Sequence, residues 1–138
     1  MIALLNTRFE DPDALETPVG AARWWNGAGL HVAGKPRFDA GLCAALRSLR
    51  GALDANVSGE PAPLPFPFRG EASDGILFEV LHAARTAIAA GDLCRIRRCG
   101  GQTCGRYFLD QTKNGSRRWC SLRCMERARA PRRRTISR

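Results

Sequence analysis

The stretch from Cys99 to Cys124 reads CGGQTCGRYFLDQTKNGSRRWCSLRC and decides how this chain is expected to fold. It holds two close cysteine pairs, C-x4-C at its start and C-x3-C at its end, with 15 residues between them. A structural Zn²⁺ ion favours four tetrahedral thiolate ligands, and two close pairs supply them with little loss of loop-closure entropy. The spacing therefore predicts one structural zinc ion, bound by Cys99, Cys104, Cys120 and Cys124.

The residues between the two pairs predict a β-hairpin that leads into a helix. Residues 107–109 favour a strand, Asn114-Gly115 favours a tight turn, and residues 117–120 are expected to form the returning strand. From Ser121 onward the pattern indicates a helix that places Cys120 and Cys124 on one face. Together these elements form a treble-clef-like finger, in which two aromatic side chains are expected to pack beside the metal, Phe108 and Trp119.

The other two cysteines leave one question about the metal ligands open. Cys94 is also followed by a cysteine after four residues, so Cys94 and Cys99 are an alternative first pair. We favour Cys99 with Cys104, because Gly105 leads directly into the expected hairpin. Cys43 is expected to be a small buried apolar residue.

The N-terminal residues and the hydropathy pattern predict where the protein is found. No basic region precedes the short apolar run at the N-terminus, so a secretion signal is not expected. A membrane-spanning helix needs about 18 or more apolar residues in a row, and the sequence has no such run. We therefore expect a cytoplasmic protein, in which clustered cysteines bind metal rather than form disulfides.

Basic residues concentrate in the segment that holds the cysteine pairs. Residues 95–138 contain 14 Lys and Arg against two acidic residues, Asp110 and Glu126, whereas residues 1–94 carry a net charge of −3. This asymmetry predicts a polyanionic partner. The alternative is a solvated basic tail that only keeps the protein soluble.

Three helices are predicted in the first 94 residues. The first begins at Thr17 and Pro18, an N-cap followed by proline, runs to about residue 26, and is expected to bury Val19, Ala22 and Trp25. The second runs from about residue 39 to 55, with one apolar face formed by Leu42, Leu46, Leu49 and Leu53.

The third helix is expected from about residue 74 to 90, with Ser73 as its N-cap and Gly91 as its end. Four prolines make residues 59–70 a loop between the second and third helices. The prediction is an α+β chain, with a small helical domain over residues 1–94 and a zinc finger with a basic helix or arm over residues 95–138.

Two parts of the finger segment resemble a known family. CGRYFLD at residues 104–110 and KNGSRRWCS at 113–121 are similar to the CGNR-type zinc finger of bacterial proteins. In that family the finger follows a helical domain called ABATE, which LLNT at residues 4–7 and LETP at 15–18 resemble. The four naming letters are Cys-Met-Glu-Arg here, at 124–127, the second cysteine pair is one residue closer than usual, and the ABATE part is shortened around the Pro-rich loop. The resemblance implies a stress-induced transcription regulator.

The basic residues of the finger are expected to bind nucleic acid, with double-stranded DNA as the expected partner. Arginine suits bidentate contacts with phosphate and guanine, and we expect Arg123 and Arg127 to contact bases. The basic arm after Pro131 suits a minor groove. The candidate nucleic-acid-binding residues are Lys113, Arg117, Arg118, Arg123, Arg127, Arg129, Arg132, Arg133 and Arg134.

One finger gives limited specificity, so a homodimer located at the nucleoid is expected. Two other functions stay open: an adaptor that binds an acidic protein, and an RNA-binding module, although aromatic residues for base stacking are few. An enzyme is not expected, because four cysteine ligands leave no open zinc position for a water molecule.

Overall fold

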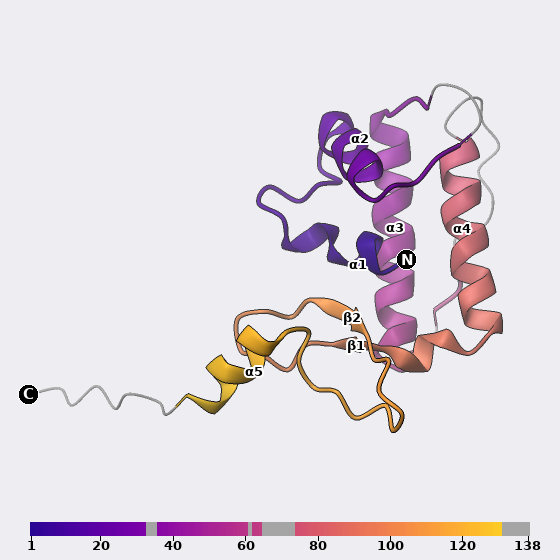
Figure 1. Ribbon diagram of the computed structural model, residues 1–138. Helices are drawn as coiled ribbons and strands as arrows, with labels where there is room; N and C mark the ends of the chain where they lie inside the picture. Colours follow the sequence, from indigo (N-terminus) through magenta and orange to yellow (C-terminus); the bar gives the residue numbers. More distant parts are fainter. Residues whose placement is uncertain (33–35, 61, 65–73, 131–138) are drawn as a thin grey trace, which may run out of the picture.

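The computed structural model describes residues 1–32, 36–60, 62–64 and 74–130, and Figure 1 shows its two parts. The upper part consists of α1 (Ile2–Asn6), the 3-10 turn η1 (Thr7–Phe9), α2 (Pro18–Gly27), α3 (Ala40–Val57) and α4 (Asp74–Ala89). The lower part consists of η2 (Asp92–Arg95), β1 (Ile96–Arg98), β2 (Tyr107–Leu109) and α5 (Leu122–Arg129). The fold is therefore a set of helices joined to one small antiparallel sheet, as the α+β prediction requires.

The capping residues fix where the helices begin. The side chain of Thr17 accepts a hydrogen bond from the Gly20 N–H, and that of Asp39 accepts one from the Leu42 N–H at 2.7 Å. These contacts confirm the predicted starts of α2 and α3. The predicted cap of α4, Ser73, lies outside the described residues, and Gly91 takes the left-handed conformation (φ +74°) just after α4 ends.

Helix α3 is the centre of the hydrophobic core. It lies beside α4 on one side and beside α1 and α2 on the other (Figure 1). The predicted leucine face of α3 is confirmed, because all four of its leucines are buried. The core consists of these leucines together with Leu4, Leu5, Leu15, Trp25, Ile76, Leu77, Val80 and Leu81.

The buried face of α2 differs from the prediction. Val19 is 70% exposed, whereas Ala21, Trp24 and Trp25 are buried. These three residues are spaced i, i+3, i+4 and define one helical stripe. The prediction of Trp25 on the apolar face is confirmed, whereas that of Val19 is wrong and Ala22 is only half-buried.

A partly buried ion pair fixes the N-terminal segment on α3. The guanidinium group of Arg50 donates to both carboxylate oxygens of Asp13, at 2.8 and 2.6 Å, and to the Thr7 hydroxyl at 2.7 Å. The bond from Arg50 and its charge hold the pKa of Asp13 below its usual range, despite an opposing effect of burial. The segment between η1 and α2 is thereby held against the middle of α3.

The sheet of the finger pairs different strands from those predicted. β1 and β2 are antiparallel, with Arg97 opposite Phe108, and the turn between them carries Cys99 and Cys104. Residues 117–120 are not a strand; the carbonyl of Arg118 accepts one backbone bond, from the Gly100 N–H at 2.9 Å. The predicted turn at Asn114-Gly115 does form, with Gly115 at φ +59°, but it joins no strands.

The finger packs against the helical part through one face of β2. Ile96 and Tyr107 belong to the same buried cluster as the leucines of α1 and α3. The Tyr107 hydroxyl donates to the carboxylate of Asp54 on α3, and its ring lies 6.4 Å from that of Phe9. The core of the helical part therefore extends to Ile96 and Tyr107, while Phe108 and the clustered cysteines form a second buried cluster within the finger. In the described residues, no helix is long and apolar enough to cross a membrane.

Candidate metal centre and basic surface

Four cysteine sulfurs meet in the finger. The Sγ atoms of Cys99, Cys104, Cys120 and Cys124 all lie within 4.8 Å of one another. Cys104 and Cys120 are 3.6 Å apart, and Cys120 and Cys124 are 3.7 Å apart. A tetrahedral site with Zn–S bonds of about 2.3 Å has sulfurs about 3.8 Å apart. The four side chains therefore fit one zinc ion, as the spacing predicted.

The first pair of ligands is placed by the turn that joins the two strands. The Cys99 N–H donates to the Arg106 carbonyl at 2.8 Å, and the Cys104 N–H donates to the Gly101 carbonyl at 3.1 Å. A Cβ atom on Gly101 would lie 3.3 Å from the Cβ of Cys104 and 3.5 Å from the sulfur of Cys99. A side chain at position 101 would therefore crowd Cys104, directly beside the metal ligands.

The second pair is placed by the start of α5. Ser121 is the N-cap, and its hydroxyl accepts a bond from the Cys124 N–H at 3.3 Å. Cys120 precedes the cap, which agrees with a helix predicted from Ser121 onward, and its sulfur lies beside that of Cys124. The Cys120 N–H also donates to the sulfur of Cys99 at 3.3 Å, which connects the two pairs.

The thiols of the cluster differ in acidity. A hydrogen bond from Ser121, with contacts from the Cys120 and Cys104 thiols, lowers the pKa of Cys124 to about 7, whereas burial raises the pKa of Cys104. Zn²⁺ binds the thiolate form of cysteine. The shifts oppose one another within the cluster, because burial and the neighbouring thiols raise the pKa of Cys120 to about 12.

The two remaining cysteines lie outside the cluster. Cys94 is exposed, and its thiol donates to the Gly91 carbonyl at 3.0 Å. Cys43 is 1% exposed in the core, as predicted. The structure therefore places Cys104, and not Cys94, with Cys99.

Comparison with known families finds a match in the finger segment. Residues 95–135 match the CGNR zinc finger. The match begins at the end of η2 and includes all four clustered cysteines and α5, whereas residues 1–94 lie outside it. Comparison with curated proteins and with solved structures finds no match.

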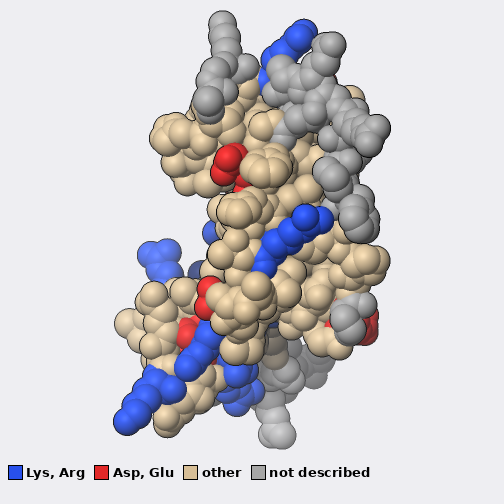
Figure 2. All heavy atoms as spheres, turned by 90° about the vertical axis from the view of Figure 1, so that its right-hand side faces the viewer, with Lys and Arg blue, Asp and Glu red and all other residues tan. Residues whose placement is uncertain are grey.

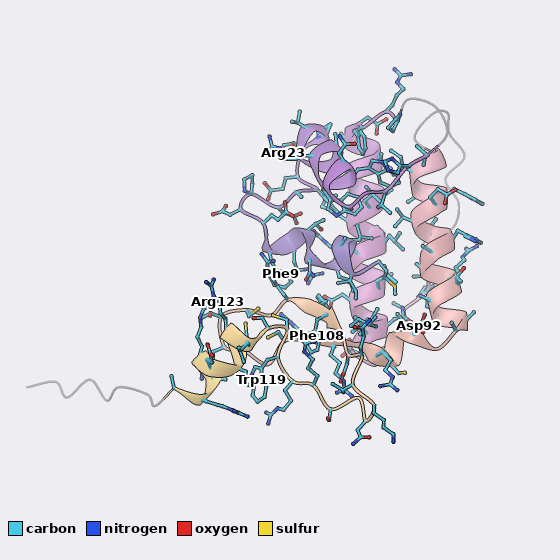
Figure 3. All side chains as sticks on the ribbon, viewed as in Figure 1. Phe9, Arg23, Asp92, Phe108, Trp119 and Arg123 are labelled. Carbon is cyan, nitrogen blue, oxygen red and sulfur yellow. The ribbon has the colours of Figure 1, made fainter. Side chains whose placement is uncertain are left out.

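The exposed Arg117 stabilises the backbone of the CGNR finger. Its Nε donates to the Trp119 carbonyl at 2.8 Å, and its Nη2 donates to the Cys120 carbonyl at 2.7 Å. Its guanidinium group also lies 5.2 Å from the centre of the Phe108 ring. Arg117 therefore fixes the backbone that carries Cys120, although the sequence predicted only a nucleic-acid contact for it. Figure 3 shows Phe108 and Trp119 in the finger, and both pack with the cysteines as predicted.

Asp110 is a structural residue of the CGNR finger that the sequence analysis did not single out. Its side chain is fully buried and accepts bonds from the Thr112 N–H, the Thr112 hydroxyl and the Arg117 N–H, at 2.9, 2.6 and 2.8 Å. The bonds from Thr112 contribute most to lowering its pKa. An aspartate followed two residues later by a threonine, with Asn-Gly two residues after that, indicates a turn that the aspartate side chain stabilises.

The basic residues of the CGNR finger are spread over its solvent-facing surface. Figure 2 shows Lys and Arg gathered at the lower end of the molecule, where the finger lies. Arg132, Arg133 and Arg134 lie outside the described residues. The other candidates are exposed: Lys113, Arg117, Arg118, Arg123, Arg127 and Arg129. The surface also includes exposed arginines that were not predicted: Arg97, Arg98 and Arg106.

Proposed function

We propose that this protein binds double-stranded DNA through its zinc finger and regulates transcription. The proposal rests on the positive charge of the finger. Residues 95–130 contain ten basic side chains, and within this described segment only Arg97 forms an ion pair, with the buried Asp110. Glu126 is the one exposed acid there. Such an excess of unneutralised positive charge suits the phosphate backbone of nucleic acid.

Helix α5 is the element we assign to the DNA groove. It projects from the finger on the side away from α3 and α4 (Figure 1). Cys124 is its only buried residue, so the metal is its main attachment, and Arg123 and Arg127 remain exposed. A helix held in this way can enter a major groove, where arginine recognises guanine through two hydrogen bonds. The remaining arginines would contact phosphates and set the orientation.

We also propose a role for the helices outside the finger. We infer a treble-clef-like finger attached to an ABATE-like helical domain that forms a homodimer and responds to stress. Enzymatic activity is not part of the proposal, because four thiolates fill a tetrahedral zinc shell and leave no site for a reacting water molecule.

A binding experiment with three polyanions tests the proposal. The zinc-loaded full chain is titrated against duplex DNA, single-stranded RNA and heparin at several salt concentrations. If about six phosphates are engaged, the logarithm of the binding constant falls against the logarithm of salt concentration with a slope of roughly −5. Preference for a duplex supports the proposal. Equal binding to all three would leave a nonspecific basic surface, and no binding to any would favour an adaptor for proteins.

A further inference from the structure

Two arginines from different segments lie over the indole ring of Trp119. The Cζ atom of Arg118 is 5.4 Å from the ring centre, and that of Arg129 is 5.9 Å from it. Both distances are within the range of a cation–π contact. Arg118 precedes the ligand Cys120, and Arg129 ends α5, so the three side chains form a cluster that joins both sides of the second cysteine pair.

The two guanidinium groups keep their hydrogen-bonding capacity free. In the described part of the chain, neither Arg118 nor Arg129 forms an ion pair or donates a side-chain hydrogen bond. Glu126 is on the same helix as Arg129 but does not pair with it. The neighbouring Arg117 differs, because its guanidinium donates to two backbone carbonyls of the finger. Arg117 therefore stabilises the backbone of the finger, whereas the guanidinium of the adjacent Arg118 is available to a partner.

The backbone around this cluster is fixed by the metal site. The Gly100 N–H donates to the Arg118 carbonyl at 2.9 Å, which holds that residue against the cysteine turn. The sulfurs of Cys120 and Cys124, which lie 3.7 Å apart, hold the start of α5 beside the same segment. The position of Arg129 beside Trp119 therefore depends on where α5 begins, whereas Arg118 is next to Trp119 in the chain.

We propose that Arg118 and Arg129 form a phosphate clamp for the DNA backbone, and that Trp119 is its positioning residue. A guanidinium fork binds a phosphate through two parallel hydrogen bonds. Stacking on the ring restricts two flexible side chains before binding, so less conformational entropy is lost when the phosphate arrives. Trp119 thus acts through the arginines instead of stacking on a base. The clamp rests on the proposed DNA binding and assigns the phosphate contact to named residues.

The test measures binding of a labelled random-sequence duplex by fluorescence anisotropy over a range of KCl concentrations. The full, zinc-loaded chain is compared with R118Q, R129Q, W119L and W119F, and with R85Q, which removes an exposed arginine on α4. The logarithm of the binding constant is plotted against the logarithm of the KCl concentration. R118Q and R129Q should each make the slope of this plot less negative by about 1, whereas R85Q should not change it. W119L should bind about 2- to 5-fold more weakly at unchanged zinc content, and W119F should retain most of the affinity.

The outcomes separate the clamp from the DNA-binding proposal. A wild-type chain that binds no duplex at any salt concentration overturns both. A wild-type chain that binds, with R118Q and R129Q indistinguishable from R85Q, overturns the clamp alone. If W119L binds as well as wild type, Trp119 is not the positioning residue. If W119L loses zinc, its affinity reports on the loss of the finger, and the clamp is then judged from the DNA affinities of R118Q, R129Q and W119F.

Discussion

The side-chain amide of Asn6 makes two hydrogen bonds with the backbone of Tyr107, which lies 101 residues later in the chain. Its Nδ2 donates to the Tyr107 carbonyl at 2.9 Å, and its Oδ1 accepts from the Tyr107 N–H at 2.8 Å. β1 pairs with the opposite edge of β2. Asn6 therefore acts as a short substitute for a third strand and joins the helical part to the finger.

Asn6→Ala should destabilise the joined structure by about 2 kcal/mol, because it leaves a donor and an acceptor of Tyr107 without their partner. Urea unfolding followed by circular dichroism measures this effect. Asn26→Ala is the matched control, because Asn26 is exposed on α2 and its change should be nearly neutral. Equal losses in both variants would contradict the role assigned to Asn6.

Cys104→Ser should reduce zinc binding from one ion per chain to little or none, because it removes one of four clustered ligands. Native mass spectrometry counts the bound metal. Cys94→Ser is the control and should retain one ion, since Cys94 lies outside the cluster. A zinc-free Cys94→Ser protein, or a fully loaded Cys104→Ser protein, would show that the ligand set is wrong.

Arg117→Ala should weaken zinc binding by about 10-fold, because removing a residue that orients a metal ligand typically lowers metal affinity by at least this factor. The effect is measured by competition with a chelator in the absence of DNA. Arg117→Lys should not rescue the loss, since an ammonium group cannot reproduce the two-pronged contact with the carbonyls of Trp119 and Cys120. Arg123→Ala should bind zinc as wild type does, and a similar loss in that control would argue against a specific role for Arg117.

The ion pair between Arg50 and Asp13 should make stability depend on pH in the acid range. Because the pKa of Asp13 is lowered in the folded state, its contribution is fully present above the ordinary aspartate pKa and is lost as pH falls through the folded value. Asp13→Asn should therefore cost about 2 kcal/mol at pH 7, and its cost should decrease as the pH is lowered to 3. Thermal unfolding at both pH values measures the difference. The control is Asp11→Asn, whose side chain is exposed, and it should show a much smaller change.

Features governed by local sequence could be predicted. Thr17 and Asp39 cap helices whose starts follow directly from short polar side chains that precede an apolar pattern. The cysteine spacing identified all four clustered sulfurs, because tetrahedral coordination places strict limits on ligand type and distance. Helix α1 was not predicted, since five residues are too few to show a helical period.

Features governed by distant contacts could not be predicted. The Asn-Gly signal suggested a hairpin at residues 107–120, but the side chain of Asp110 stabilises that turn and β2 pairs with β1 instead. Strands of three residues carry too little alternation to identify their partners. The contacts of Tyr107 with Asn6 and Asp54 join residues that nothing in the local sequence relates.

The joint between Asn6 and Tyr107 also has a consequence during biosynthesis. Asn6 is synthesised 101 residues before Tyr107, so the part of the helical surface that the finger covers has no partner until that strand is made. A chain released before residue 107 would keep Asn6 and Asp54 without the Tyr107 backbone and hydroxyl that satisfy them. Prematurely terminated copies would thus carry an uncovered polar and apolar surface that chaperones and proteases can recognise.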